Sequence, residues 1–138
     1  MVVKMSVLET QSGYNSLSEL TSNSYLVPRL TDILSRLKEL RSLQSGWLNG
    51  NGNKLNSEGI IWLELFFEKI FPEDISLPYL YPTVEGGIQA EWPGKASLEI
   101  DLSNYRAELC CFAEDIDLSL DLDNTNDQHV LFKKIRDM

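Results

Sequence analysis

The chain has 138 residues, of which 43% are hydrophobic and 24% are charged, a composition that predicts one soluble globular domain and excludes a two-domain enzyme. Its 21 acidic residues outnumber 12 basic ones, and the formal net charge is −9. This charge argues against general binding to nucleic acids or anionic membranes, which requires a cationic surface, and it permits a basic protein partner.

The sequence shows no targeting segment. Residues 1–16 lack the unbroken apolar stretch of about 7 to 15 residues found in secretory signals, and no window approaches the ~18 apolar residues of a membrane span. Cys110 and Cys111 are adjacent, and because successive side chains of a strand point to opposite faces, a disulfide between them is disfavoured. We expect a cytoplasmic protein without a disulfide framework.

Residues 1–25 are predicted to form a flexible polar leader, and residues 26–138 a single α+β domain. Ser, Thr, Asn and Gln dominate from Glu9 to Ser24, where apolar residues are isolated. A short docking helix around residues 16–20 is the alternative interpretation of this segment.

Two helices are predicted after the leader. Beyond Pro28, apolar residues recur with helical spacing over residues 30–43, which indicates a helix that packs by one side. A loop rich in Gly and Asn follows. A second helix is expected over residues 56–71 and is ended by Pro72. Because apolar residues cover most of its circumference, we expect it to lie between the first helix and a sheet.

The apolar period changes to two from Tyr79 onward, which is typical of strands with one buried face. Pro82 indicates that the first strand lies at an edge or carries a bulge. Short turns separate the strands, so we expect an antiparallel meander. The expected strands cover residues 79–84, 88–92, 96–102, 105–113 and 116–122.

A helix is predicted at the C-terminal end, because Thr125 and Gln128 have the spacing of a capping box before an apolar segment. Helices and strands are therefore segregated along the chain. The predicted fold is an α+β two-layer sandwich in which two N-terminal helices pack on an antiparallel meander of about five strands, followed by a short C-terminal helix.

Large aromatic residues are expected to fill the space between helices and sheet, because they dominate core energetics. The residues assigned to this core are Trp62, Trp92, Phe66, Phe67, Phe71, Tyr79 and Tyr81. Trp47 lies in the loop rich in Gly and Asn. It either packs at the junction of helices and sheet or projects as an anchor for a partner.

The sequence contains no pattern of a catalytic or metal centre. His129 is the single histidine, it has no local cluster of partners, and no Gly-x-Ser-x-Gly elbow is present. A calcium loop counted from Asp117 would place Leu122 and Gln128 where Gly and Glu are required. Two adjacent cysteines and one histidine do not form a zinc pattern. We therefore expect no cofactor, no metal and no enzymatic activity.

Negative charge is concentrated in the predicted sheet. From Glu85 to Asp123, ten acidic residues stand against Lys95 and Arg106, a local net charge of −8. Regularly spaced carboxylates on the polar face either keep the domain soluble or bind a basic protein surface. The predicted partner-binding residues are Glu91, Glu99, Asp101, Glu108, Asp117, Asp121 and Trp47.

Several motifs occur in a fixed order: the loop 46–50 (Gly-Trp-Leu-Asn-Gly), the apolar helix after it, Tyr-Pro-Thr at 81–83, and Glu-Gly-Gly-Ile-Gln-Ala-Glu-Trp at 85–92. This order resembles an uncharacterised family of small bacterial proteins with a GW(D)G-like loop and a PT…(D/E)GGI..EW strand hairpin. The resemblance covers residues 30–122. Two residues, Leu48 and Asn49, stand where the family has one Asp, and Glu85 replaces another Asp. The resemblance implies a bacterial accessory protein from a mobile or defence-related gene cluster, with no established reaction.

The leading hypothesis is a non-enzymatic protein-binding module of antitoxin, immunity or inhibitor type, whose acidic sheet face engages a basic protein. One alternative is a structural or accessory subunit of a larger bacterial, defence-related complex, which would use apolar helix surface or the sheet edge at Pro82. A second alternative is a small metal-dependent hydrolase built on the sheet carboxylates. Neither membrane association nor direct sequence-specific binding of nucleic acid is expected, and the oligomeric state is left open.

Overall fold

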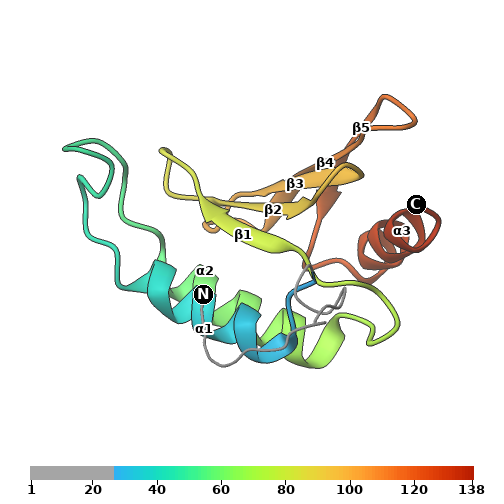
Figure 1. The fold of residues 1–138 in the computed structure, drawn as a ribbon, viewed down its shortest axis with the longest axis horizontal. Helices are drawn as coiled ribbons and strands as arrows, with labels where there is room; N and C mark the ends of the chain where they lie inside the picture. The colour runs from blue at the N-terminus through green and yellow to red at the C-terminus, as the bar shows by residue number, and fades with distance from the viewer. Residues whose placement is uncertain (1–26) are drawn as a thin grey trace, which may run out of the picture.

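The computed structural model describes residues 27–138, in the order of two helices, five strands and a final helix (Figure 1). The predicted α+β sandwich is confirmed: one layer is an antiparallel sheet, and the helices form the other layer. The polar leader predicted for residues 1–25, with its alternative helix, lies outside the described residues.

The first helix, α1 (Leu30–Arg41), follows the predicted apolar stripe. Asp32 in its first turn accepts a hydrogen bond from the backbone N–H of Arg29 at 2.9 Å, and the basic residues of its last turn complement the helix dipole. The helix is followed by Ser42, whose hydroxyl donates to the Glu39 carbonyl. Its buried residues are Ile33, Leu37 and Leu40.

The second helical segment is α-helical only in its first part, α2 (Ser57–Leu65), which Asn56 caps by accepting a hydrogen bond from Gly59. It continues as a π-helix, η4 (Phe66–Ile70), in which the N–H of Phe71 donates to the carbonyl of Phe66. An α-helix through Phe71 was expected. The wider turn places the neighbouring Phe66 and Phe67 side chains together in the core.

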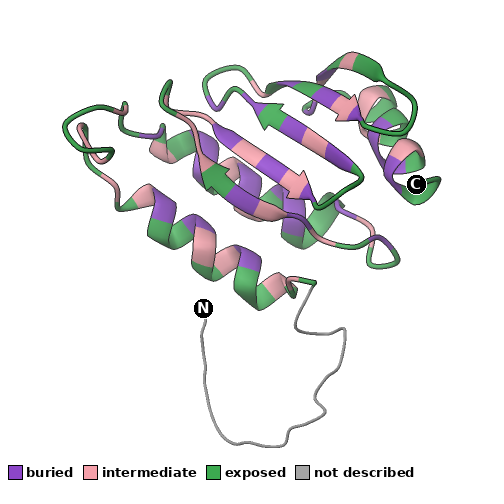
Figure 2. Cartoon of the chain, turned by 45° about the horizontal axis from the view of Figure 1, so that its top comes forward, coloured by how far each residue is buried: buried purple, intermediate pink, exposed green. Residues whose placement is uncertain are grey.

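The sheet has the predicted meander order, β1-β2-β3-β4-β5, and every neighbouring pair is antiparallel. Buried residues alternate with less buried ones along the strands (Figure 2). The buried positions of neighbouring strands lie opposite one another, as in the pairs of Ile88 with Ile100 and Leu98 with Leu109. The strands are β1 (Tyr79–Pro82), β2 (Ile88–Trp92), β3 (Ala96–Ile100), β4 (Arg106–Cys111) and β5 (Ile116–Asp121).

The final helix, α3 (Thr125–Arg136), packs beside the other helices, because the ring of Phe132 lies 5.4 Å from that of Phe71. Its N-cap is Asn124, whose side chain accepts from the N–H of Asp127 at 3.0 Å. The capping box predicted to start at Thr125 is therefore wrong by one residue, because Asn124 has the extended backbone that a cap requires.

Most of the predicted core aromatics are confirmed. Trp62 stacks on Tyr105 with ring centroids 4.4 Å apart, and the buried Trp92 donates its indole N–H to the carbonyl of Ser76. The assignment of Tyr79 and Tyr81 to the core is wrong. Leu80, between them, takes the core-facing position of β1, so both tyrosines lie on the opposite face, and Tyr81 is 47% exposed.

Candidate functional site

One face of the sheet is left uncovered by the described helices, which all lie on its other side (Figure 1). We call it the open face. Its members alternate with the buried residues of each strand, as the period of two predicts. They are Tyr79, Tyr81, Gln89, Glu91, Ser97, Glu99, Arg106, Glu108, Cys110, Asp117, Ser119 and Asp121.

Strand register brings the predicted carboxylates into two rows on the open face. In one row, Glu99 is directly opposite Glu108, with Gln89 and Ser119 at their outer sides. The other row contains Glu91 and Asp117. Because neighbouring strands lie about 4.8 Å apart, the facing glutamates repel one another.

The open-face carboxylates have no cation partner in the part of the chain that the structure describes. All five ion pairs there join residues of helices, their flanks and loops. They are Arg29–Asp32, Arg36–Glu39, Lys133–Asp137, Lys134–Glu114 and Arg136–Asp74. The open-face carboxylates therefore take part in none of the ion pairs of the described residues, although Arg106 lies on the same face, directly opposite Asp121.

Neutral side chains orient several of these carboxylates. Gln89 donates its amide to Glu91 at 2.9 Å, and the hydroxyl of Ser119 donates to Glu108. Asp117 accepts a hydrogen bond from the thiol of Cys110, which raises the pKa of that thiol. The thiol therefore stays protonated at neutral pH and is not an activated nucleophile.

Asp101 and Asp121 take part in turns at one end of the sheet. Asp101 accepts hydrogen bonds from the hydroxyl and the N–H of Ser103, at 2.6 and 2.9 Å, and these bonds lower the pKa of Asp101. Asp121 accepts from the N–H of Asp123 at 3.0 Å. Both carboxylates thus accept hydrogen bonds from nearby residues. The carboxylate of Glu99, in contrast, forms no hydrogen bond or ion pair with any other described residue.

A hollow of about 540 Å³ lies beside the facing pair Glu99 and Glu108. Four acidic residues and two basic ones line it: Glu85, Glu99, Asp101, Glu108, Lys54 and Arg106. The other lining residues are Asn56, Thr83, Gly86, Gly87, Ile100, Leu102, Ser103 and Ala107. The hollow has the charge and polar lining to receive a cationic group.

This hollow forms because the β1–β2 turn meets the segment before α2. The N–H of Asn53 donates to the carbonyl of Val84 at 2.9 Å, and a Cβ on Gly87 would lie 2.5 Å from the carbonyl oxygen of Ile100. Only glycine permits that approach. The sequence did not predict that Lys54 and Glu85 would line this hollow. The only feature of the sequence that pointed to it was the Glu-Gly-Gly turn at residues 85–87, where glycine permits close approach of another segment.

Within residues 27–138, no three side chains of His, Cys, Asp or Glu converge in a group that could hold a metal ion. The carboxylates of the open face are instead spread along the rows of the sheet. A spread of fixed negative charges on a rigid sheet attracts ammonium and guanidinium groups, each of which can bind one or two carboxylates.

Trp47 lies in a small hairpin of its own. Leu48 and Asn51 exchange backbone hydrogen bonds of 2.7 and 2.8 Å, and the residues between them have the positive φ angles of a type I′ turn. The indole covers Gly52 and donates its N–H to the carbonyl of Asn53 at 2.8 Å. Trp47 is not packed against the core, so its predicted place at the helix–sheet junction is wrong.

Comparisons with known proteins add no relative: no family model, no curated protein and no solved structure matches the chain. The resemblance to small bacterial proteins stays a prediction. None of the helices between residues 27 and 138 combines the length and apolar character needed to cross a membrane.

Proposed function

We propose that this chain is a non-enzymatic, cytoplasmic protein-binding module of antitoxin, immunity or inhibitor type, and that its open face engages a basic protein. One observation carries the proposal: Glu91, Glu99, Glu108 and Asp117 share one uncovered sheet face and form no ion pair with any described residue. The basic residues that form ion pairs in the described chain do so with acids of the helices, their flanks and the loops.

A sheet suits this role because its carboxylates are held at fixed spacings. Glu99 and Glu108 are exposed on adjacent strands, so they remain hydrated until a partner arrives. An excess of negative charge on one face also speeds the encounter with a partner of opposite charge. The hollow beside them offers a place for one long basic side chain.

The test compares two double variants that remove the same charge from different surfaces. E99Q/E108Q changes the open face, and E68Q/E73Q changes exposed glutamates at the helical side of the chain. Binding of a labelled lysine-rich peptide is measured by fluorescence anisotropy across a salt series. We expect the open-face variant to lose about tenfold in affinity at low salt and to show a shallower salt dependence.

Equal loss in both double variants contradicts the proposal, because the peptide would then sense only net charge. Binding that does not weaken with rising salt also contradicts it, since contacts between exposed charges are screened.

One observation favours the second candidate, a subunit of a larger complex. Ile61 and Leu65, one turn apart on α2, are 44% and 52% exposed. Apolar side chains in such positions are typical of helix surfaces that pack against another protein. A complex formed through these apolar side chains would persist at high salt. The variant I61S/L65S would dissociate it, whereas E99Q/E108Q would leave it intact.

A further inference from the structure

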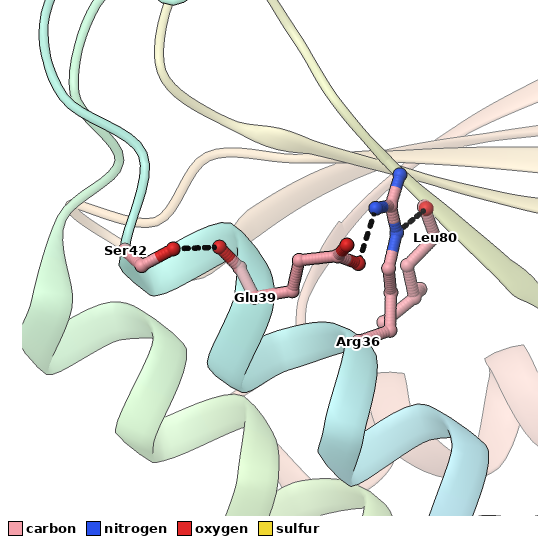
Figure 3. Close-up of polar contacts among 4 residues, drawn as sticks. All are labelled: Arg36, Glu39, Ser42 and Leu80. Carbon is pink, nitrogen blue, oxygen red and sulfur yellow. Dashed lines mark hydrogen bonds and ion pairs between the residues drawn. The ribbon is translucent and has the colours of Figure 1, made fainter. Parts of the chain in front are cut away.

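The two edge strands of the sheet, β1 and β5, differ in whether their outward backbone N–H and carbonyl groups are free to pair with another strand. At the β1 edge, the guanidinium of Arg36 donates through Nε to the carbonyl of Leu80 at 2.9 Å (Figure 3). Pro82, two residues on, has no N–H to offer. This edge is blocked, so the sheet edge at Pro82, which the subunit hypothesis invoked, is a poor site for another strand.

At the other edge, the direction of the β5 backbone follows from its hydrogen bonds. The N–H of Leu122 donates to the carbonyl of Tyr105, toward β4. Backbone polar groups alternate in direction along a strand, so residues 116, 118 and 120 also face β4. Residues 117, 119 and 121 therefore direct their N–H and carbonyl groups away from the sheet.

Of these three residues, Asp121 is satisfied within the chain. Its N–H donates to the carboxylate of Asp127 at 2.8 Å, and its carbonyl accepts from the N–H of Asn124 at 3.0 Å. The outward groups of Asp117 and Ser119 have no such partner in the described chain. They form a template of alternating donors and acceptors that an added strand can pair with.

The side chains beside this template define the chemistry of its occupant. On the open face, Asp117 would lie beside the added strand. On the other face, Ile116 is 36% exposed and Leu118 is half-buried. A strand with basic residues on one side and aliphatic residues on the other complements both.

We infer that β5 is a docking edge, and that the basic partner adds an extended segment of alternating basic and aliphatic residues beside it. This inference rests on the proposed function and specifies how the partner binds. A second copy of the chain fits poorly. An antiparallel pair centred on Ser119 would place Asp117 of each copy opposite Asp121 of the other, with like charges in contact.

The test uses the full chain and a peptide of alternating lysine and valine. S119P removes one outward N–H, at a position where an edge strand tolerates proline, and S119A is its control because both variants lose the hydroxyl bond to Glu108. We expect S119P to bind the peptide about tenfold more weakly than S119A does, because the backbone hydrogen bond between residue 119 and the added strand is lost. Thermal unfolding checks that both variants fold.

A second probe changes the peptide, so its main comparison is made on wild-type protein and does not require S119P to fold. N-methylation of the peptide backbone on its pairing side keeps its charge and removes its donors. We expect this peptide to bind wild-type protein about tenfold more weakly than the unmethylated one, and to show little further loss on S119P.

The outcomes separate this inference from the proposed function. Equal binding to S119P and S119A, with no effect of N-methylation, overturns the docking edge and leaves the acidic-face proposal standing. No binding of either peptide to wild-type protein at low salt overturns both. A wild-type dimer in analytical ultracentrifugation that S119P dissociates also overturns the inference, because the edge is then occupied by a second copy.

Discussion

At the scale of single residues, long-range side-chain contacts join segments that are distant in the sequence. Arg136 of α3 donates through Nε and Nη2 to the two carboxylate oxygens of Asp74, at 2.8 and 3.2 Å. Asp74 lies in the loop between η4 and β1. The guanidinium hydrogen bond lowers the pKa of Asp74 below its ordinary value of 3.8. This pair therefore links the C-terminal end of α3 to the loop between η4 and β1.

The lowered pKa of Asp74 predicts an effect of pH on stability. The folded chain releases this proton more readily than the unfolded chain, so the contribution is complete above pH 3.8 and is lost as pH falls through the folded pKa. In R136Q, we expect carboxyl NMR titration to show the Asp74 pKa raised toward its ordinary value. K133Q, which removes a different exposed ion pair, is the control. An unchanged Asp74 pKa in R136Q would contradict the assignment.

At the scale of elements, Arg36 connects α1 to β1 and protects an edge of the sheet. Its Nε donates to Leu80 and its Nη1 to Glu39, at 2.9 and 2.7 Å (Figure 3). The pair with Glu39 is exposed and contributes little. The bond to the Leu80 carbonyl joins residues far apart in the sequence and is the one that matters for the fold.

R36M is expected to lower the free energy of unfolding by about 1 kcal/mol, because the methionine keeps the aliphatic stem and loses the donor to Leu80. Amide exchange of the β1 residues should become faster than in wild type, as β1 opens more often. K38M, an exposed change on the same helix, is the control and is expected to match wild type in both measurements. A variant R36M that exchanges and unfolds like K38M would show that the edge bond is dispensable.

The periodicity of the sequence was sufficient to predict the elements but not the contacts between them. Apolar spacing located α1 and all the strands, because each buries one side. The π-helical turn begins at Phe66, whose ring lies 6.1 Å from that of Phe132 in α3. The outward placement of Tyr79 and Tyr81 follows from the burial of Leu80 against the helices. Neither is determined by local pattern.

The candidate site was predictable only as a set of alternating acidic positions. Glu99 and Glu108 were placed on one face by the period of two, and the meander order made them neighbours. Their hollow was not predictable, because Lys54 reaches it from the segment before α2. The difference between the two edges depends on Arg36, Asp127 and Asn124, whose contacts form only in the folded chain.

At the scale of the whole molecule, the net charge of −9 is unevenly distributed. Ion pairs compensate acids of the helices and loops, while the facing carboxylates Glu99 and Glu108 of the open face form no ion pair with any described residue. Repulsion of this kind destabilises the fold. A surface retained for binding is expected to carry such a cost, because sites that serve function are rarely optimal for stability.

This trade-off gives the last prediction. E99Q/E108Q removes the repulsion, and because glutamine keeps an oxygen, residue 108 can still accept from Ser119. We expect the free energy of unfolding in urea to rise by about 0.5 kcal/mol at low salt, while peptide binding falls. Sodium chloride at about 1 M shortens the screening length to ~3 Å, which is below the spacing of the facing glutamates, and should narrow the difference in stability between the variant and wild type. E68Q/E73Q should change stability less. If E99Q/E108Q instead destabilises the chain, these carboxylates support the sheet itself, and the cost attributed to binding does not exist.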